Sequence, residues 1–112
     1  MEAIILAGGR GTRLKGVIKD IPKPLAPVNG KPFLTYLMDN LIKQDINHFI
    51  LSTGYKQNMI YKYFGNSYKS IKISYAQEKE PLGTGGAILN ALKYCNSRFV
   101  YALNGDIYTN YP

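Results

Sequence analysis

The chain has 112 residues, of which 46% are hydrophobic, and a formal net charge of +7. A chain of this length forms one domain at most, and its hydrophobic content is ordinary for a globular protein and too high for an intrinsically disordered one. No run of 18 apolar residues and no cleavable signal pattern is visible, and the single cysteine, Cys95, cannot form an internal disulfide. We therefore expect a cytoplasmic protein without a membrane partner, in which Cys95 is a plain core thiol.

The basic excess could attract nucleic acid. However, the lysines are scattered along the chain, with no run of basic residues and no nucleic-acid-binding motif. We expect no nucleic-acid partner, because anionic small substrates are the better explanation of the charge.

The first half of the chain predicts two buried strands with a helix between them. Residues 3–7 are a short apolar run, typical of a strand that is buried on both faces. His48–Thr53 predicts a second such strand, which ends at Gly54. Between them, with Pro32 suited to the first turn, apolar residues follow the spacing of an amphipathic helix. They are Leu34, Leu37, Met38, Leu41 and Ile42.

The second half continues the alternation of helices and strands. Asn58 is placed to cap a short helix that runs to Phe64. Alternating apolar residues over 71–75 predict a strand, the apolar spacing over 87–92 predicts a helix, and the run 99–103 predicts another strand. Strands that alternate with helices predict an α/β fold with a mostly parallel sheet.

The first strand leads into a glycine cluster that carries positive charge. Gly8, Gly9 and Gly11 let the backbone approach a phosphate closely, and amide N–H groups in such a loop form an anion-binding nest. Arg13 and Lys23, the latter between two prolines, add fixed positive charge. The combination indicates a polyphosphate site, and a nucleoside triphosphate is the ligand that fits it best.

Two other phosphate-binding motifs are excluded by the same segment. A Walker A loop ends in Gly-Lys followed by Ser or Thr, and the chain has no such sequence. A dinucleotide-binding fingerprint needs a third glycine at the position that Leu14 occupies.

Four motifs then identify a family. They are G-G-R-G-T-R-L at 8–14, P-K-P-L at 22–25, E-P-L-G-T-G-G-A at 80–87 and L-N-G-D at 103–106. In this order they resemble the signature of the sugar-1-phosphate nucleotidylyltransferases, above all the guanylyltransferases that act on manno-configured sugars. The resemblance implies a Rossmann-like three-layer sandwich. It also implies transfer of GMP from GTP to a sugar 1-phosphate, with D-glycero-D-manno-heptose 1-phosphate the expected acceptor, for cell-surface polysaccharide (lipopolysaccharide or capsule) synthesis.

Two residues are expected to be catalytic. Arg13 would grip the β- and γ-phosphates, because its planar fork matches phosphate oxygens in pairs. Lys23 would lie against the α-phosphate and the incoming sugar phosphate as a point charge; the alternative is a solvated loop lysine. Arg10 is left open between a phosphate contact and solvent.

The nucleotide is expected to contact two segments. Ligands of open α/β sheets bind at the carboxyl ends of the strands, which both segments follow. Glu80 can accept hydrogen bonds from two donors of guanine, where uracil or thymine offers one, while Gly83 leaves room for the base; a solvated carboxylate is the alternative for Glu80. The expected nucleotide-binding residues are Leu6, Ala7, Gly8, Gly9, Gly11, Thr12, Arg13, Gln77, Glu80 and Gly83.

Asp106 is the expected ligand of Mg²⁺, which prefers oxygen ligands and is held by one or two carboxylates plus substrate phosphates. The alternative is an Asn-Gly-Asp turn closed by a local side-chain bond. His48, the one histidine of the sequence, is given no role.

The chain is shorter than members of the family, which carry a second metal-binding aspartate and the sugar-contacting residues in their later half. We therefore interpret residues 1–112 as the nucleotide-binding part of a nucleotidyltransferase domain, truncated at its C-terminus. On their own these residues are expected to be inactive and to associate or dissolve poorly, so homo-oligomers are left open. The alternatives are a non-catalytic nucleotide-binding remnant, or transfer to mannose 1-phosphate, choline phosphate or the molybdenum cofactor.

Overall fold

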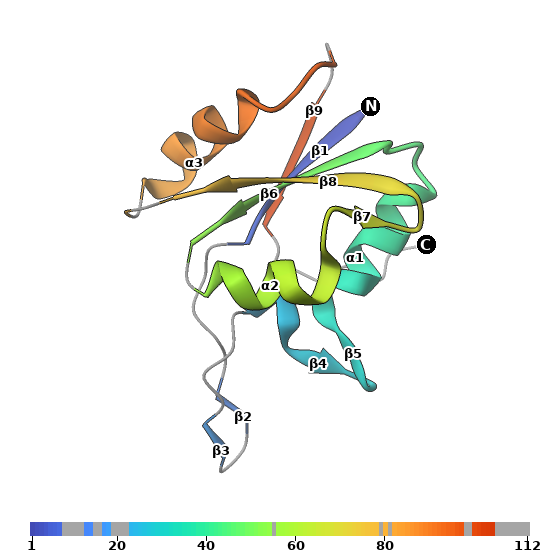
Figure 1. The fold of residues 1–112 in the computed structure, drawn as a ribbon, viewed down its shortest axis with the longest axis vertical. Helices are drawn as coiled ribbons and strands as arrows, with labels where there is room; N and C mark the ends of the chain where they lie inside the picture. Colours follow the sequence, from blue (N-terminus) through green and yellow to red (C-terminus); the bar gives the residue numbers. More distant parts are fainter. Residues whose placement is uncertain are drawn as a thin grey trace.

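A five-stranded sheet organises the protein, as Figure 1 shows. The computed structural model describes residues 1–7, 13–14, 17–18, 23–54, 56–78, 80, 82–97 and 100–104, with the backbone alone at 13–14, 17–18, 23 and 104. In spatial order the strands are β7 (Ser67–Tyr68), β8 (Ile71–Gln77), β6 (His48–Thr53), β1 (Glu2–Leu6) and β9 (Val100–Asn104). All neighbours are parallel except β7 and β8, so the predicted mostly parallel sheet is confirmed.

The central strands explain why the sequence reads as apolar runs. Every residue of β6 is buried, as is most of β1, because parallel strands in this class are covered on both faces. The strand predicted over residues 3–7 is observed one residue earlier, and the strand His48–Thr53 is observed with its predicted bounds.

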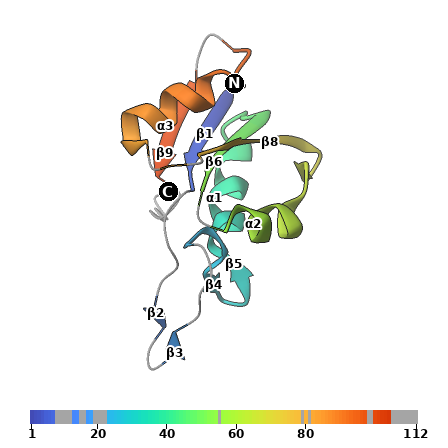
Figure 2. The same cartoon turned by 60° about the vertical axis from the view of Figure 1, so that its left-hand side comes forward.

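Helices cover both faces of the sheet and complete three layers (Figures 1 and 2). Helices α1 (Phe33–Ile42) and α2 (Gln57–Phe64) pack on the face that carries Ile5 and Leu51. Helix α3 (Gly83–Leu92) covers the opposite face through Ala91, against Ile4 and Ile50. The predicted α/β sandwich is therefore observed.

Some local predictions are wrong. Pro32 does not lie in the first turn of α1, because it ends the short strand β5 and precedes the helix. Asn58 does not cap α2, which begins at Gln57 directly after Lys56, a residue in the left-handed conformation with φ 53°. The tight turn after Gly54 starts the helix before Asn58 is reached.

Two predicted apolar segments at the end of the chain are more exposed than expected. Leu92 closes α3 with its side chain exposed, although its spacing predicts a buried face. Strand β9 pairs with β1 alone among the described strands, and Tyr101 on it is 45% exposed. Phe99, the predicted start of this strand, lies outside the described residues.

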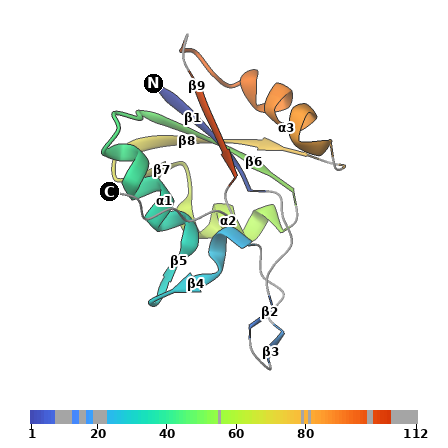
Figure 3. The same ribbon diagram turned by 180° about the vertical axis from the view of Figure 1, so that it is seen from behind.

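Shorter elements connect β1 to α1. Strands β2 (Arg13–Leu14) and β3 (Val17–Ile18) pair with each other, and Figure 3 shows them beyond the end of the sheet. The 3₁₀ turn η1 (Lys23–Leu25) and strands β4 (Pro27–Val28) and β5 (Lys31–Pro32) follow. Within the described residues, we find no helix that is long and apolar enough to cross a membrane.

Candidate functional site

The carboxyl ends of four strands meet at one edge of the sheet. Leu6 of β1 lies in register with Ser52 of β6 on one side and with Asn104 of β9 on the other, while Ser52 lies in register with Ala76 of β8. The N–H of Ala7 donates to the carbonyl oxygen of Ser52 at 2.7 Å. The end of β1 is therefore anchored to β6 at Ala7.

A carboxylate fixes the turn between β8 and α3. The side chain of Glu78 accepts a hydrogen bond from the Ser52 hydroxyl at 3.1 Å and another from the backbone N–H of Leu82 at 3.0 Å. Its own N–H donates to the carbonyl oxygen of Thr53 at 2.7 Å. Glu78 thus joins the ends of β6 and β8 to the first turn of α3.

The start of α3 depends on Gly83. This residue has φ +73°, which side chains with a Cβ rarely adopt. The glycine was predicted to leave room for a base; its backbone conformation is a second reason for glycine at this position. Leu82 precedes Gly83 as the N-cap residue of α3 and makes no side-chain capping hydrogen bond. The first-turn N–H groups of α3, at the carboxyl edge, therefore receive no cap from this residue.

The structure brings several predicted nucleotide-binding residues to this edge. Leu6 and Ala7 lie where β1 ends, Gln77 ends β8 with its side chain exposed, and Glu80 and Gly83 flank the start of α3. Contact of these residues with a nucleotide stays a prediction.

The predicted phosphate-binding residues are placed only in part. Lys23 begins η1, and neighbouring Leu25 packs against the core on the α1 side. Arg13 belongs to β2, which lies with β3 beyond the end of the sheet in Figures 1 and 3. Gly8, Gly9, Arg10, Gly11, Thr12 and Asp106 lie outside the described residues.

The metal prediction cannot be located on described side chains. Asp106 follows β9 by two residues, and β9 ends beside Leu6. Among the residues that the structure describes, no group of three His, Cys, Asp or Glu side chains could hold a metal ion.

Sequence reasoning missed the polar side chains beneath the edge. Ser52, Thr53 and Glu78 stand at or directly after strand ends, where ligands of α/β sheets bind, and this position was the available signal. Thr53 is 0% exposed, and its hydroxyl has no hydrogen-bond partner among the residues that the structure describes.

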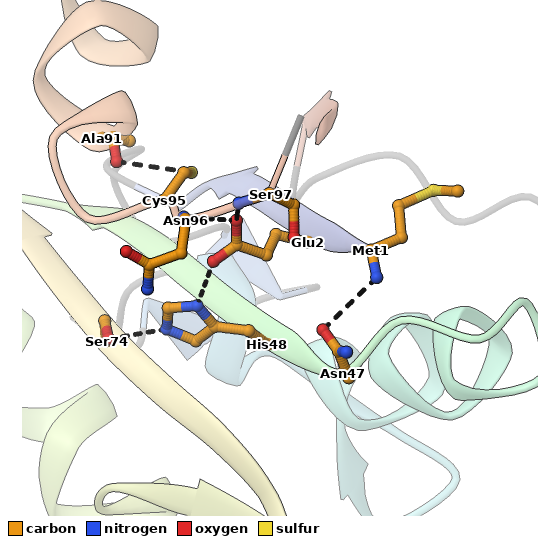
Figure 4. Close-up of polar contacts among 9 residues, drawn as sticks. All are labelled: Met1, Glu2, Asn47, His48, Ser74, Ala91, Cys95, Asn96 and Ser97. Carbon is orange, nitrogen blue, oxygen red and sulfur yellow. Dashed lines mark hydrogen bonds and ion pairs between the residues drawn. The ribbon is translucent and has the colours of Figure 1, made fainter. Parts of the chain in front are cut away.

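A second polar cluster lies at the opposite, amino end of the sheet (Figure 4). Glu2 accepts a hydrogen bond from Nδ1 of His48 at 2.5 Å and two more from the N–H groups of Asn96 and Ser97. Nε2 of His48 lies 2.8 Å from Oγ of Ser74. This cluster joins β1, β6 and β8 to the turn before β9.

The cluster sets the charge state of its carboxylate. Burial raises the pKa of Glu2, but hydrogen bonds from His48, Ser97 and Asn96 outweigh it and hold the pKa below its ordinary value. A charged Glu2 requires a proton on Nδ1 of His48, so Nε2 of a neutral imidazole accepts from the Ser74 hydroxyl. Although serine, histidine and acid lie in the order of a hydrolytic triad, the cluster is at the far end from the candidate site, and we assign it a structural role.

Cys95 is half-buried, with its thiol 3.7 Å from the carbonyl oxygen of Ala91. Burial, and then the charge of Glu2, raise the pKa of this thiol. Its surroundings are those of a packed, unreactive thiol.

Comparisons with known proteins agree on nucleotidyl transferases. Residues 2–112 match the nucleotidyl transferase family. The chain is 55% identical over 108 residues to D-glycero-alpha-D-manno-heptose 1-phosphate guanylyltransferase of Campylobacter jejuni, an alignment that covers 96% of this chain and 48% of the relative. It is 39% identical over 108 residues to mannose-1-phosphate guanylyltransferase of Mycobacterium tuberculosis, covering 96% of this chain and 30% of the relative.

Solved structures agree. HddC from Yersinia pseudotuberculosis complexed with GMP-PN superposes with a TM-score of 0.79 at 46% identity, covering 94% of this chain and 47% of that one. UDP-glucose pyrophosphorylase complexed with UDP-glucose gives a TM-score of 0.77 at 26% identity, covering 99% and 48%. The chain spans about half the length of the heptose guanylyltransferases that it matches.

Proposed function

The chain belongs to the nucleotidyl transferase family, and from this premise we propose that it is the nucleotide-binding part of a sugar-1-phosphate guanylyltransferase. The proposed reaction transfers GMP from GTP to D-glycero-α-D-manno-heptose 1-phosphate and releases pyrophosphate. The observation that supports the proposal is the alignment of strand ends, in which Ala7 at the end of β1 and Glu78 at the end of β8 are both hydrogen-bonded to the end of β6.

The reaction needs positioning and positive charge more than a protein nucleophile. A phosphate oxygen of the sugar 1-phosphate attacks the α-phosphorus of GTP, and the bond from that phosphorus to the bridging oxygen of the β-phosphate breaks, so pyrophosphate leaves. Arg13 and Lys23 are proposed to neutralise the phosphates, which otherwise repel each other. The Ser74–His48–Glu2 cluster lies at the other end of the sheet and takes no part.

A divalent cation fits the proposed chemistry of the carboxyl edge, because Asp106 and the phosphates offer the hard oxygen ligands that Mg²⁺ prefers. When bound there, Mg²⁺ would offset the negative charge of the phosphates. We expect Asp106→Asn to weaken the Mg²⁺ dependence of nucleotide binding and leave base selectivity unchanged; loss of the guanine preference in this variant would contradict the metal assignment.

Guanine selectivity is the finer part of the proposal. Glu80 is exposed at the turn before α3, where its carboxylate can accept from N1–H and from the 2-amino group of guanine together. Calorimetric titration of the full-length protein with GTP, UTP, dTTP and CTP in the presence of Mg²⁺ tests it. We expect GTP to bind most tightly, and a preference for UTP or dTTP would contradict the guanine assignment.

Mannose 1-phosphate is the second candidate acceptor, since a mannose-1-phosphate guanylyltransferase is 39% identical over nearly the whole chain. The higher identity to the heptose enzymes, 55%, favours heptose. Turnover with each sugar 1-phosphate at equal concentration distinguishes the two acceptors.

A further inference from the structure

Ser52 makes hydrogen bonds to two different segments at the carboxyl edge, one through its carbonyl oxygen and one through its hydroxyl. The carbonyl oxygen of Ser52 accepts the N–H of Ala7, the residue from which the glycine segment departs. The hydroxyl of Ser52 donates to Oε1 of Glu78. Because Ser52 is only 1% exposed and lies on a strand paired on both sides, it is held rigidly.

Glu78 carries the connection onward to the base side. Its Oε2 accepts the backbone N–H of Leu82, which closes the turn that contains Glu80 and begins α3. The backbone of Glu78 is itself anchored, because its N–H donates to the carbonyl oxygen of Thr53. Both carboxylate oxygens are therefore engaged within the protein before any ligand binds.

This use of the carboxylate argues against a primary role in direct base contact. Glu78 is half-buried beneath the turn, whereas Glu80 on the same turn is exposed to a ligand. The carboxylate of Glu78 accepts from the Ser52 hydroxyl at 3.1 Å and from the Leu82 N–H at 3.0 Å, so one side chain joins the end of β6 to the turn. It is thus suited to hold the turn in one geometry, and a preorganised turn binds its ligand at a lower entropic cost.

We propose that Ser52 and Glu78 form a positioning bridge for the nucleotide site, which fixes the end of β1 at Ala7 and the turn before α3 relative to each other. The inference rests on the proposed function and deepens it. Neither side chain needs to touch the nucleotide. The bridge should therefore strengthen the binding of any purine nucleoside triphosphate by the same factor, independently of the groups that Glu80 reads.

The test is a double-mutant cycle in the full-length protein. Kd values for GTP and for inosine triphosphate, which lacks the 2-amino group, are measured by calorimetry for the parental protein, Ser52→Ala, Glu78→Gln and the double variant. We expect Glu78→Gln to weaken both nucleotides about tenfold, as the loss of about 1.4 kcal/mol would. Ser52→Ala should act in the same direction and less strongly, and the double variant should lose less than the sum of the two, because both changes break one bridge.

Controls separate this inference from its alternatives. Glu80→Gln should weaken GTP more than inosine triphosphate, and Asp45→Asn, an exposed change on the loop after α1, should leave both Kd values unchanged. Circular dichroism establishes that each variant is folded, and Ser52→Ala carries the test if Glu78→Gln does not fold.

Three results would overturn the bridge. Unchanged Kd values in both Glu78→Gln and Ser52→Ala would exclude it. If Glu78→Gln weakened the binding of GTP but not of inosine triphosphate, Glu78 would contact guanine directly. If the free-energy losses of the two single variants added up to that of the double variant, Ser52 and Glu78 would act independently. Each of these leaves the proposed function standing, whereas a parental protein that binds neither nucleotide contradicts both.

Discussion

The two ends of the sheet use buried polar groups in opposite ways. At the amino end, Glu2 and His48 are buried and each polar atom of their side chains has a partner within the protein. At the carboxyl end, Ser52 is paired with Glu78, but the Thr53 hydroxyl is buried with no partner among the described residues, and Gln77 and Glu80 are exposed. A satisfied buried network stabilises one structure, while unpaired and exposed groups are available to a ligand. We infer that the amino end contributes stability and the carboxyl end contributes function.

The substitution with the largest expected effect removes a positive charge at the proposed nucleotide site. Lys23→Ala should lower kcat about 10²–10³-fold, the range measured when one preorganised donor to a developing charge is removed. Its melting temperature should stay at the parental value. Steady-state kinetics with GTP and the sugar 1-phosphate, together with thermal unfolding, give both readings. Lys43→Ala, at an exposed lysine just after α1, is the matched control, and similar kcat values in the two variants would refute the role of Lys23.

The amino end should show the reverse pattern. Glu2→Gln should lower the free energy of unfolding by about 1.5–3 kcal/mol, because it removes charge from a buried carboxylate that accepts three hydrogen bonds. GTP affinity of the folded variant should be unchanged. Urea unfolding and calorimetry measure the two quantities. Asp45→Asn, which removes an exposed carboxylate, should be close to neutral, and an equal loss in both variants would contradict the structural role of Glu2.

The pH dependence of stability sharpens the same contrast. The folded-state pKa of Glu2 lies below its ordinary value of 4.5, so its contribution is fully present above pH 4.5 and is lost as the pH falls through the lowered folded value. Asp39, whose pKa is also lowered, acts in the same direction. We therefore expect the stability difference between the parental protein and Glu2→Gln to shrink below about pH 4.5. Urea unfolding from pH 7 to pH 3 measures it, and a difference that stays constant would be evidence against the shift.

The substitution with the smallest expected effect should leave the free energy of unfolding unchanged or raise it. Thr53→Val replaces a buried hydroxyl, which has no partner in the described part of the chain, by a methyl group of similar shape, so the unfolding free energy should stay constant or rise by up to about 1 kcal/mol. Thermal unfolding without nucleotide measures this. A clear loss of stability would mean that the hydroxyl has a structural partner, which would weaken the contrast between the two ends.

The sequence predicted the sheet and its helices because their apolar patterns are periodic. The burial of a strand is visible in its own sequence, as in the apolar run His48–Thr53 and in the alternating residues from 71 onward. The start of α2 was wrong because the left-handed conformation of Lys56 has no sequence signal comparable to glycine or asparagine. The short strands β4 and β5 were missed because they hold two residues each, too few for a periodic pattern.

Placement at the carboxyl edge was predictable where a motif follows a strand, and it was hidden where several segments meet. Glu80 and Gly83 belong to the motif 80–87, and Gln77 was named beside it; their contact with a nucleotide stays a prediction. The bond between Ser52 and Glu78, and that between Glu2 and His48, join residues 26 and 46 positions apart. Such pairs depend on strand order and register, which the spacing of apolar residues leaves open.

Pyrophosphate release by the full-length protein tests the function of the carboxyl edge most directly. It is assayed with Mg²⁺ and either GTP and D-glycero-α-D-manno-heptose 1-phosphate together or GTP alone, at a temperature where all variants are folded. We predict sustained release with both substrates and none with GTP alone. Release should be retained in Glu2→Gln and lowered about 10²–10³-fold in Lys23→Ala. No release from the folded parental protein, or equal release from Lys23→Ala, would contradict the account.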